Sequence, residues 1–400
     1  MESPFENKKH CCGCGACANA CTHQAISMIA DSQGFVYPVI DQNKCINCGL
    51  CKKVCGYGKE KLLQREKQLC YGGIDCSVEK SNSSSGGIAN VMAKWIIHNG
   101  GIVYGCALEI EEGKLTPKHI RVQSERELTK LQGSKYVQSD IGNVYSQAKE
   151  DLKNGELVLF TGTPCQIAGL KSHLRHSYEN LLTIDIICHG VPSKQLFLDS
   201  IQAFEEINSG KVISLQFRDK SKFPALNQKI IYNQKIIYNQ KTVIRYYTDS
   251  LYYTCFLRGD TYRDSCYSCP YAQKQRIGDI SLGDFWGVEN TNPKEIKKKG
   301  GPIDPQQGVS CILVNSKQGS KMLEAVKEKL YLFDSNIEDI SRCNHQLSNP
   351  SKKTFCRDRI FKVYEKNGYV GFKNAVYEAY KWPTRIAKVK QIIKKIICIK

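Results

Sequence analysis

The sequence predicts an α/β protein, α+β overall, in which a small cysteine-rich N-terminal domain precedes a larger mixed α/β domain. Two sets of four cysteines, both with the same spacing pattern, occupy residues 11–55. From about residue 70 onward, apolar runs of strand length alternate with segments of helical periodicity, which is typical of an α/β architecture. A chain of 400 residues is too long for one small core, so we expect two or three domains.

Each cysteine set has the spacing C-x2-C-x2-C-x3-C, which places three thiols on one tight coil. A [4Fe–4S] cubane needs four thiolates, and in two-cluster proteins the fourth comes from the last cysteine of the other set. The spacing therefore assigns Cys11, Cys14, Cys17 and Cys55 to one cluster, and Cys45, Cys48, Cys51 and Cys21 to the other. About the first 60 residues resemble bacterial two-[4Fe–4S] ferredoxins. Thr22 and Gly56 stand where such ferredoxins usually have proline.

The segment between the two sets reads as a strand, a turn and a strand, with residues 26–29 and 35–39 flanking Asp31–Gly34. A zinc module is the first alternative, but it needs only four ligands, whereas eight fall here in two equal sets. A disulfide framework is the second, and it requires an oxidising compartment. Cys12 has the wrong offset for a ligand, so we expect it to be a spectator.

The composition is that of a soluble globular protein, with 41% hydrophobic and 24% charged residues. The first ten residues contain no apolar core of a secretory signal, and no run of about 18 apolar residues could span a bilayer. Twenty-one cysteines in such a chain favour a reducing compartment with metal ligands. We therefore expect a cytoplasmic protein.

The formal charge of +18 would ordinarily favour nucleic acid or a membrane surface as a partner. Each oxidised cubane with its four thiolates contributes −2, so three clusters would lower the charge to about +12. The basic excess is concentrated in residues 381–400, where apolar residues recur at helical spacing among seven Lys or Arg. A basic amphipathic helix there could lie on a membrane or cover a protein surface.

Further elements follow from the periodicity of the chain after a charged connector at residues 57–68. The predicted strands are residues 70–74, 102–108, 157–160, 181–187 and 309–314. The predicted helices are residues 88–97, 141–152, 167–174 and 317–330. Residues 227–232 are repeated directly as 233–238, which we interpret as a lengthened hairpin or loop.

Two predicted strands each end close to a cysteine, Cys165 and Cys188. Ligands of open α/β sheets gather at the carboxyl ends of the strands. Cys266 and Cys269 form a CxxC pair, which alone is open to zinc, redox or chance interpretations but here completes a set of four. Cys106, within a predicted strand, is most simply a small core residue.

A serine–glycine loop, residues 81–87, opens the helix predicted at residues 88–97. Free N–H groups at a helix start suit a phosphate group, although the pattern alone fits an ordinary serine N-cap better. Cys188-His189 could suggest a nucleophilic dyad, but adjacent residues of an extended strand point to opposite sides. Asp279 and Asp284 fit a role near a cofactor or in turns. No catalytic residue is identified.

Six ordered strings together resemble the beta subunit family of coenzyme F420 hydrogenase and dehydrogenase. They are SSSGG (83–87), GSKYVQSD (133–140), GTPCQIAGLK (162–171), CHGVPS (188–193), SCYSCPYA (265–272) and RIGDISLGDFWG (276–287). The likeness covers about residues 68–335. It suggests a ferredoxin-like domain over residues 1–60, two parts of the family domain over 68–150 and 151–335, and a helical basic extension over 336–400.

The resemblance implies FAD and a third [4Fe–4S] cluster. The implied ligands of the third cluster are Cys165, Cys188, Cys266 and Cys269. The implied flavin-pocket residues are Ser83, Ser85, Gly86, Gly87, Lys135, Tyr136, Gln138, Thr163, Pro164 and Gln166. With the resemblance, the phosphate and N-cap interpretations of the serine–glycine loop become about equal in weight.

The resulting hypothesis is an iron–sulfur flavoprotein oxidoreductase. It would pass electrons between ferredoxin-type clusters and a flavin, and on to the deazaflavin coenzyme F420 or another small acceptor. The first alternative is an electron-relay subunit of a larger hydrogenase- or dehydrogenase-type complex. The second, a zinc-dependent nucleic-acid-binding protein, lacks aromatic residues interleaved with lysines. We expect a redox partner protein or a small-molecule donor or acceptor, and no nucleic acid.

Overall fold

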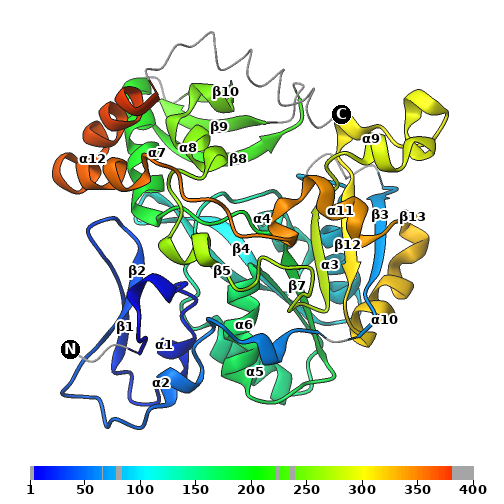
Figure 1. The fold of residues 1–400 in the computed structure, drawn as a ribbon, viewed down its shortest axis with the longest axis horizontal. Helices are drawn as coiled ribbons and strands as arrows, with labels where there is room; N and C mark the ends of the chain where they lie inside the picture. Colours follow the sequence, from blue (N-terminus) through cyan, green and yellow to red (C-terminus); the bar gives the residue numbers. More distant parts are fainter. Residues whose placement is uncertain (1–3, 65, 78–82, 222–225, 235–238, 381–400) are drawn as a thin grey trace.

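The computed structural model describes residues 4–64, 66–77, 83–221, 226–234 and 239–380 (Figure 1). Its N-terminal domain pairs the antiparallel strands β1 (Ile26–Ala30) and β2 (Val36–Ile40) beside two short helices, α1 (Ala16–Ala20) and α2 (Leu50–Lys53). The turn forms because the Asp31 carboxylate accepts hydrogen bonds from the N–H groups of Gln33 and Phe35. Gly34 adopts φ 76°, which favours glycine. The predicted strand–turn–strand is confirmed.

An eight-stranded mixed sheet forms the centre of the molecule, in the order β13-β3-β12-β11-β7-β6-β4-β5. The bounds are β3 (Leu69–Asp75), β4 (Ile102–Glu111), β5 (Lys114–Val122), β6 (Val158–Gly162), β7 (Leu181–Ile186), β11 (Ile280–Asp284), β12 (Ser310–Val314) and β13 (Leu330–Asp334). Strands β4, β6, β7 and β11 are parallel neighbours, and the others pair antiparallel. The sequence segments 68–150 and 151–335 thus contribute to one sheet.

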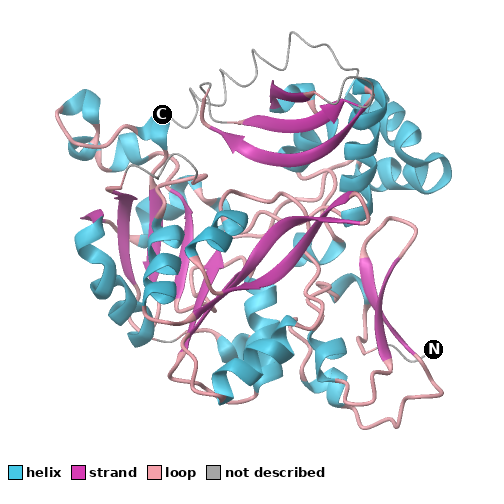
Figure 2. Cartoon of the chain, turned by 180° about the vertical axis from the view of Figure 1, so that it is seen from behind, coloured by secondary structure: helices cyan, strands magenta, loops and turns pink. Residues whose placement is uncertain are grey.

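Helices cover both faces of this sheet (Figure 2). On one face, α3 (Ile88–His98) and α10 (Lys317–Val326) pack on residues such as Leu159, while α4 (Glu125–Leu131) lies beside α3. On the other face, α5 (Val144–Lys153) and α6 (Pro164–Leu174) pack on Val158 and Phe160. Because successive strand residues point to opposite faces, the first three residues of β6, Val158 to Phe160, are all apolar.

A second sheet of three antiparallel strands lies at the top of the view in Figure 1. It contains β8 (Gly210–Asp219), β9 (Asn227–Gln234) and β10 (Gln240–Tyr246). Its core also includes α7 (Lys194–Asn208), α8 (Leu251–Arg258) and α12 (Arg357–Tyr380). The repeated hexapeptide supplies β9, which pairs with β10 as a hairpin, and the end of the second copy lies outside the described residues.

The remaining short helices are α9 (Val288–Thr291) and α11 (Ile337–Cys343). Within the described ranges, no helix combines the length and apolar character that crossing a bilayer requires. The amphipathic helix predicted in residues 383–400 lies outside the described residues.

Candidate functional site

The first predicted thiol set is brought together in the N-terminal domain. Cys17 lies in the electrostatic field of Cys14, Cys11 and Cys55. Burial raises the pKa of the Cys11 thiol to about 11, as expected for a thiol held away from water. A cavity adjoins the set and is lined by six cysteines, namely Cys11, Cys12, Cys14, Cys17, Cys51 and Cys55. The thiols therefore surround a common space.

Three members of the second set are neighbours in the same domain. Burial raises the pKa of Cys51, with smaller contributions from Cys48 and Cys45. Cys48 is exposed. The fourth predicted member, Cys21, lies at the C-terminal end of α1, where its sulfur accepts a hydrogen bond of 3.3 Å from the Ala25 N–H.

The third set combines cysteines from three separate parts of the chain. Cys165 is in the first turn of α6, Cys188 follows β7, and Cys266 lies in the short 3-10 helix η5 (Asp264–Ser268), just before Cys269. Burial raises the pKa of Cys188 well above its ordinary value. The nearby thiols of Cys266, Cys165 and Cys269 raise it further through charge repulsion. All four residues that the resemblance implied are therefore together.

Local interactions fix these positions. The Thr163 N–H donates to the Gln166 side chain at 3.0 Å, and Thr163 Oγ1 lies 3.2 Å from Cys165 Sγ, so a capping box orients the start of α6. On the CxxC side, a buried ion pair of 2.8 Å joins Arg276 to Asp185 at the end of β7. Arg276 also donates to the Tyr271 carbonyl at 3.0 Å. The CxxC segment is thereby tied to β7.

The first and third thiol sets adjoin one another where α1 packs against α6. A Cβ added to Gly169 of α6 would lie 3.1 Å from Cys14 Sγ, and one added to Gly56 would lie 3.0 Å from the same sulfur. Only glycine allows this approach without displacement of the neighbours. Cys12 is buried, and the Cys14 and Cys165 thiols are the neighbours that raise its pKa. The predicted spectator therefore lies at the junction of two thiol sets.

Gln138 and Arg263 complete this junction. Gln138 Nε2 donates to the carbonyl oxygens of Cys12 and Gly13, at 3.0 and 3.3 Å. Gln138 Oε1 accepts two hydrogen bonds from Arg263, at 3.1 and 3.0 Å. Both side chains are buried. Gln138, implied by the resemblance as a flavin contact, thus binds the N-terminal domain.

Single-ion sites are absent from the part of the chain that the structure describes, because no three His, Cys, Asp or Glu side chains there form a group that could hold one metal ion. Each thiolate of a cubane binds a different iron, so a cluster requires thiols around a space and not at one point.

The other implied flavin residues lie along the carboxyl ends of the parallel strands. The Ser134 N–H donates to Ser84 Oγ at 2.6 Å, which joins the serine–glycine loop to the segment that contains Lys135. Gly87 precedes α3 in a left-handed conformation, and no side chain caps the helix, so the predicted serine N-cap is not present. Burial lowers the pKa of Lys135 to about 8. Lys135 Nζ donates to the Gln132 carbonyl at 2.8 Å.

The remaining implied residues have other partners within the protein. Ser85 Oγ donates to the Val309 carbonyl at 2.9 Å, and Gly86 N–H donates to Ser310 Oγ at 3.0 Å. Tyr136 stacks on Phe256 with ring centres 4.3 Å apart. Ser83 and Pro164 belong, respectively, to the serine–glycine loop and the first turn of α6.

Apolar surface is exposed at the carboxyl ends of β7 and β11. Ile186 is 45% exposed and Trp286 is 43% exposed. Arg218, from β8, lies over the Trp286 ring at 5.5 Å and donates to the Asp284 carboxylate at 2.8 Å. We call Ile186, Trp286, Arg218 and Asp284 the carboxyl-edge surface. Asp279, by contrast, accepts from Thr183 and Ser316 and is structural.

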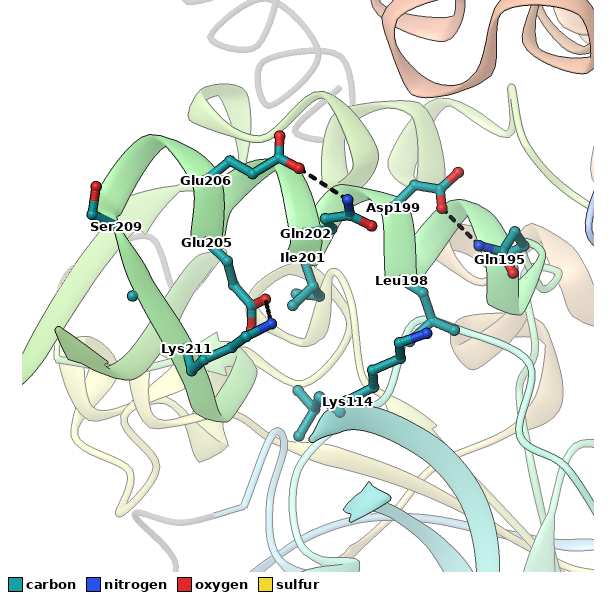
Figure 3. A pocket seen from close by; sticks show the side chains of 12 residues that line it. Lys114, Gln195, Leu198, Asp199, Ile201, Gln202, Glu205, Glu206, Ser209 and Lys211 are labelled. Atoms are coloured by element: carbon teal, nitrogen blue, oxygen red, sulfur yellow. Dashed lines mark hydrogen bonds and ion pairs between the residues drawn. The ribbon is translucent and has the colours of Figure 1, made fainter. Parts of the chain in front are cut away.

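A separate pocket of about 520 Å³ lies between α7, the start of β5 and the start of β8 (Figure 3). Its polar side chains are largely paired with one another, as in the 2.7 Å contacts of Gln195 with Asp199 and of Lys211 with Glu205. None of the twelve cysteines predicted as ligands and none of the implied flavin residues lines it. The chemistry of the thiol sets therefore lies elsewhere.

Comparisons with known proteins agree with the sequence motifs. Residues 155–340 match the model for the C terminus of the coenzyme F420 hydrogenase/dehydrogenase beta subunit, and residues 10–59 match that of a 4Fe-4S dicluster domain. No curated protein sequence matches the chain. A xenon-derivatised structure of the F420-reducing [NiFe] hydrogenase complex from Methanosarcina barkeri is similar, at 18% identity and a TM-score of 0.41. That match covers 79% of this chain and 93% of the other.

Proposed function

For a chain that belongs, over residues 155–340, to the coenzyme F420 hydrogenase/dehydrogenase beta subunit family, we propose an iron–sulfur flavoprotein oxidoreductase function. The electron-transfer and 4Fe-4S character follows from the two family matches. The flavin, the third cluster and a small-molecule acceptor, coenzyme F420 or another, are parts of the proposal. The observation that carries it is the convergence of Cys165, Cys188, Cys266 and Cys269 from three parts of the chain.

The chemistry of this donor set fits a cubane. The four thiols are neighbours and form no disulfide, and burial raises the pKa of Cys266 to about 12. Binding to iron removes the thiol proton, so cluster assembly offsets this cost of ionisation. Cys165, Cys188, Cys266 and Cys269 also retain some accessible surface, as ligands that border a shared space should.

When bound, the clusters would carry electrons singly and the flavin would accept them as a pair. The chain's own part is to hold these groups and to exclude water. Tyr262 performs the second task beside Cys188. The ring is buried, and a Cβ on Gly190 would lie 2.4 Å from it, so the backbone and the ring are in close contact.

The carboxyl-edge surface supports a flavin site next to the third thiol set. Its exposed Trp286 and Ile186 offer apolar contact for a ring system, since exposed apolar patches commonly mark ligand sites. Lys135 offers positive charge for phosphate groups, whereas the buried Asp75 carboxylate already lies beside Gly87 at the start of α3. These groups lie at the same sheet edge because β3, β6, β7 and β11 run in one direction.

A relay subunit without its own substrate site is the second candidate, and the exposure of Cys48 favours it. A cluster at the surface can exchange electrons with a partner protein. The two candidates differ in turnover, because a relay reduces artificial dyes but converts no metabolite.

The test is anaerobic purification of the full chain, with iron, sulfide and flavin quantified per chain. The proposal expects about twelve irons and one flavin. About eight irons would remove the role of the third set, and full iron without flavin would support the relay candidate.

A further inference from the structure

Arg263 is a completely buried cation with an unusual environment. Its guanidinium donates to the carbonyl oxygens of Cys11 and Val36, at 3.2 and 2.8 Å, and to Gln138 Oε1. All these acceptors are neutral. Within the described ranges, Arg263 forms no ion pair with a carboxylate.

Two other buried arginines show what the usual arrangement is. Arg276 is paired with Asp185 at 2.8 Å, and Arg357 is paired with Asp264 at 3.3 Å. Burying a charge without a counter-charge costs several kcal/mol, which is why buried arginines are normally paired. Arg263 therefore requires a negative charge from another source.

The thiols around Arg263 identify that source. Arg263 lies in the electrostatic field of Cys11, which belongs to the first set. It also lies in the field of Cys165 and Cys266, which belong to the third set. The rings of Tyr37 and Phe35 pack on the guanidinium, with their centres at 4.6 and 5.2 Å.

We propose that Arg263 is the shared counter-charge of two cluster sites, the one at Cys11, Cys14, Cys17 and Cys55 and the one at Cys165, Cys188, Cys266 and Cys269. This inference rests on the proposed function, since it assumes that both sites hold cubanes. Each oxidised cubane with its thiolates carries −2, and reduction adds one more negative charge. A fixed cation stabilises the reduced form more, so Arg263 raises the reduction potentials of both sites together.

Arg263 is a positioning residue with a measurable electrostatic effect. The site near Cys45, Cys48 and Cys51 does not share it, because the charge neighbours of Cys51 are Cys48 and Cys45. Substitution of Arg263 should therefore change the reduction potentials of the first and third sites and leave that of the site near Cys48 unchanged.

The test is a redox titration of the anaerobically purified full chain, followed by electron paramagnetic resonance. Cys48→Ser and Cys188→Ser identify which signals belong to the outer and third sites. Arg263→Gln is expected to lower the reduction potentials of the first and third sites. The equilibrium constant for one-electron reduction of each site should fall by about tenfold or more, as for removal of a nearby unit charge. Arg263→Lys keeps the charge and is expected to retain most of both potentials.

Gln138→Glu provides a second variant in case Arg263→Gln does not assemble its clusters. It places a carboxylate against the guanidinium and is expected to lower the same two potentials while Arg263 stays in place. Arg357→Lys is the matched control, since it alters a buried arginine that already has carboxylate partners.

The results separate the two levels of the argument. Unchanged potentials, or equal shifts at all three sites, in variants that keep full iron would overturn the role of Arg263 and leave the proposed function standing. A wild-type protein with only two clusters would instead remove the proposed third site.

Discussion

Gln138 Nε2 donates a hydrogen bond of 3.0 Å to the carbonyl oxygen of Cys12, across 126 positions of the sequence. The contact joins the segment before α5 to the N-terminal domain at the point where two thiol sets adjoin. Both polar atoms of the Gln138 side chain have partners, because Nε2 donates to Cys12 and Oε1 accepts a hydrogen bond from Arg263. The attachment of the N-terminal domain thus depends on a buried network.

Gln138→Ala should weaken that attachment. The substitution removes a hydrogen-bond partner from the Cys12 and Gly13 carbonyls and from the Arg263 guanidinium, and each buried unsatisfied group costs about 1–3 kcal/mol. Urea unfolding under anaerobic conditions measures the loss. Gln202→Ala is the control, since Gln202 bonds Glu206 on the exposed side of α7 and should change stability by less than about 0.5 kcal/mol. Equal losses in both variants would contradict the network.

Cys188→Ser should remove one cluster and spare the other two. The charge neighbours of Cys188 are the three other thiols of the third set. Iron per chain should fall from about twelve to about eight, because one cubane holds four irons. Cys76→Ser, at an exposed position, should leave the iron content unchanged. Retention of all iron in Cys188→Ser would contradict the assignment of this ligand.

His119 should make the protein less stable in mild acid. Burial lowers its pKa to about 4, and its ring nitrogens lie 3.0 Å from the Thr161 carbonyl and 2.9 Å from Ser139 Oγ. The unfolded chain binds a proton near pH 6.5 and the folded chain does not, so the stabilisation is complete above pH 6.5 and is lost as the pH falls toward 4.

Between pH 6.5 and 5 this loss amounts to about 2 kcal/mol. Unfolding free energies of the wild type and of His119→Gln, measured at both pH values, isolate the contribution of His119. Other histidines whose pKa is lowered by burial, such as His173, are present in both proteins. The wild type should lose more stability than the variant over this interval. If the wild type and the variant lost the same unfolding free energy, His119 would have the same pKa in the folded and unfolded states.

Arg276→Met should be strongly destabilising. It would leave the Asp185 carboxylate buried without its cation, and loss of one partner of a buried ion pair costs about 3–5 kcal/mol. Lys274→Met, which breaks an exposed ion pair with Glu338, should cost less than about 1 kcal/mol. Thermal unfolding of the two variants makes the comparison. A small effect at Arg276 would indicate that Asp185 is sufficiently held by the N–H groups of Ile277 and Gly278.

Local patterns predicted the parts of the fold that depend on neighbouring residues. The strands that became β6 and β7 were identifiable as short apolar runs. The helix predicted at residues 167–174 corresponds to α6, which begins three residues earlier, at Pro164. The third thiol set could be assembled from the sequence only with the aid of the family resemblance. The four cysteines of this set come together because β6, β7 and β11 are parallel neighbours. The order of strands in a sheet cannot be read from the sequence of one strand.

The residues that the sequence did not reveal act across long separations. Arg263 and Gln138 are 125 positions apart, and no local pattern marks either as a member of the junction. We expected Cys12 to be a spectator because its offset does not fit the ligand spacing. Its neighbour Cys165 comes from the larger domain, and sequence spacing cannot reveal such a contact. The repeat at residues 227–238 was predicted as a hairpin or loop, and its first copy forms most of β9, which pairs with β10.

Helix α6 carries Cys165 in its first turn and Gly169 one turn later against Cys14. One rigid support therefore sets the spacing between two sites that belong to different domains. Electron exchange across this boundary would proceed at a fixed separation, with no docking or closure step to regulate it. Regulation of electron transfer would then have to act where a partner protein docks or where a small-molecule acceptor binds.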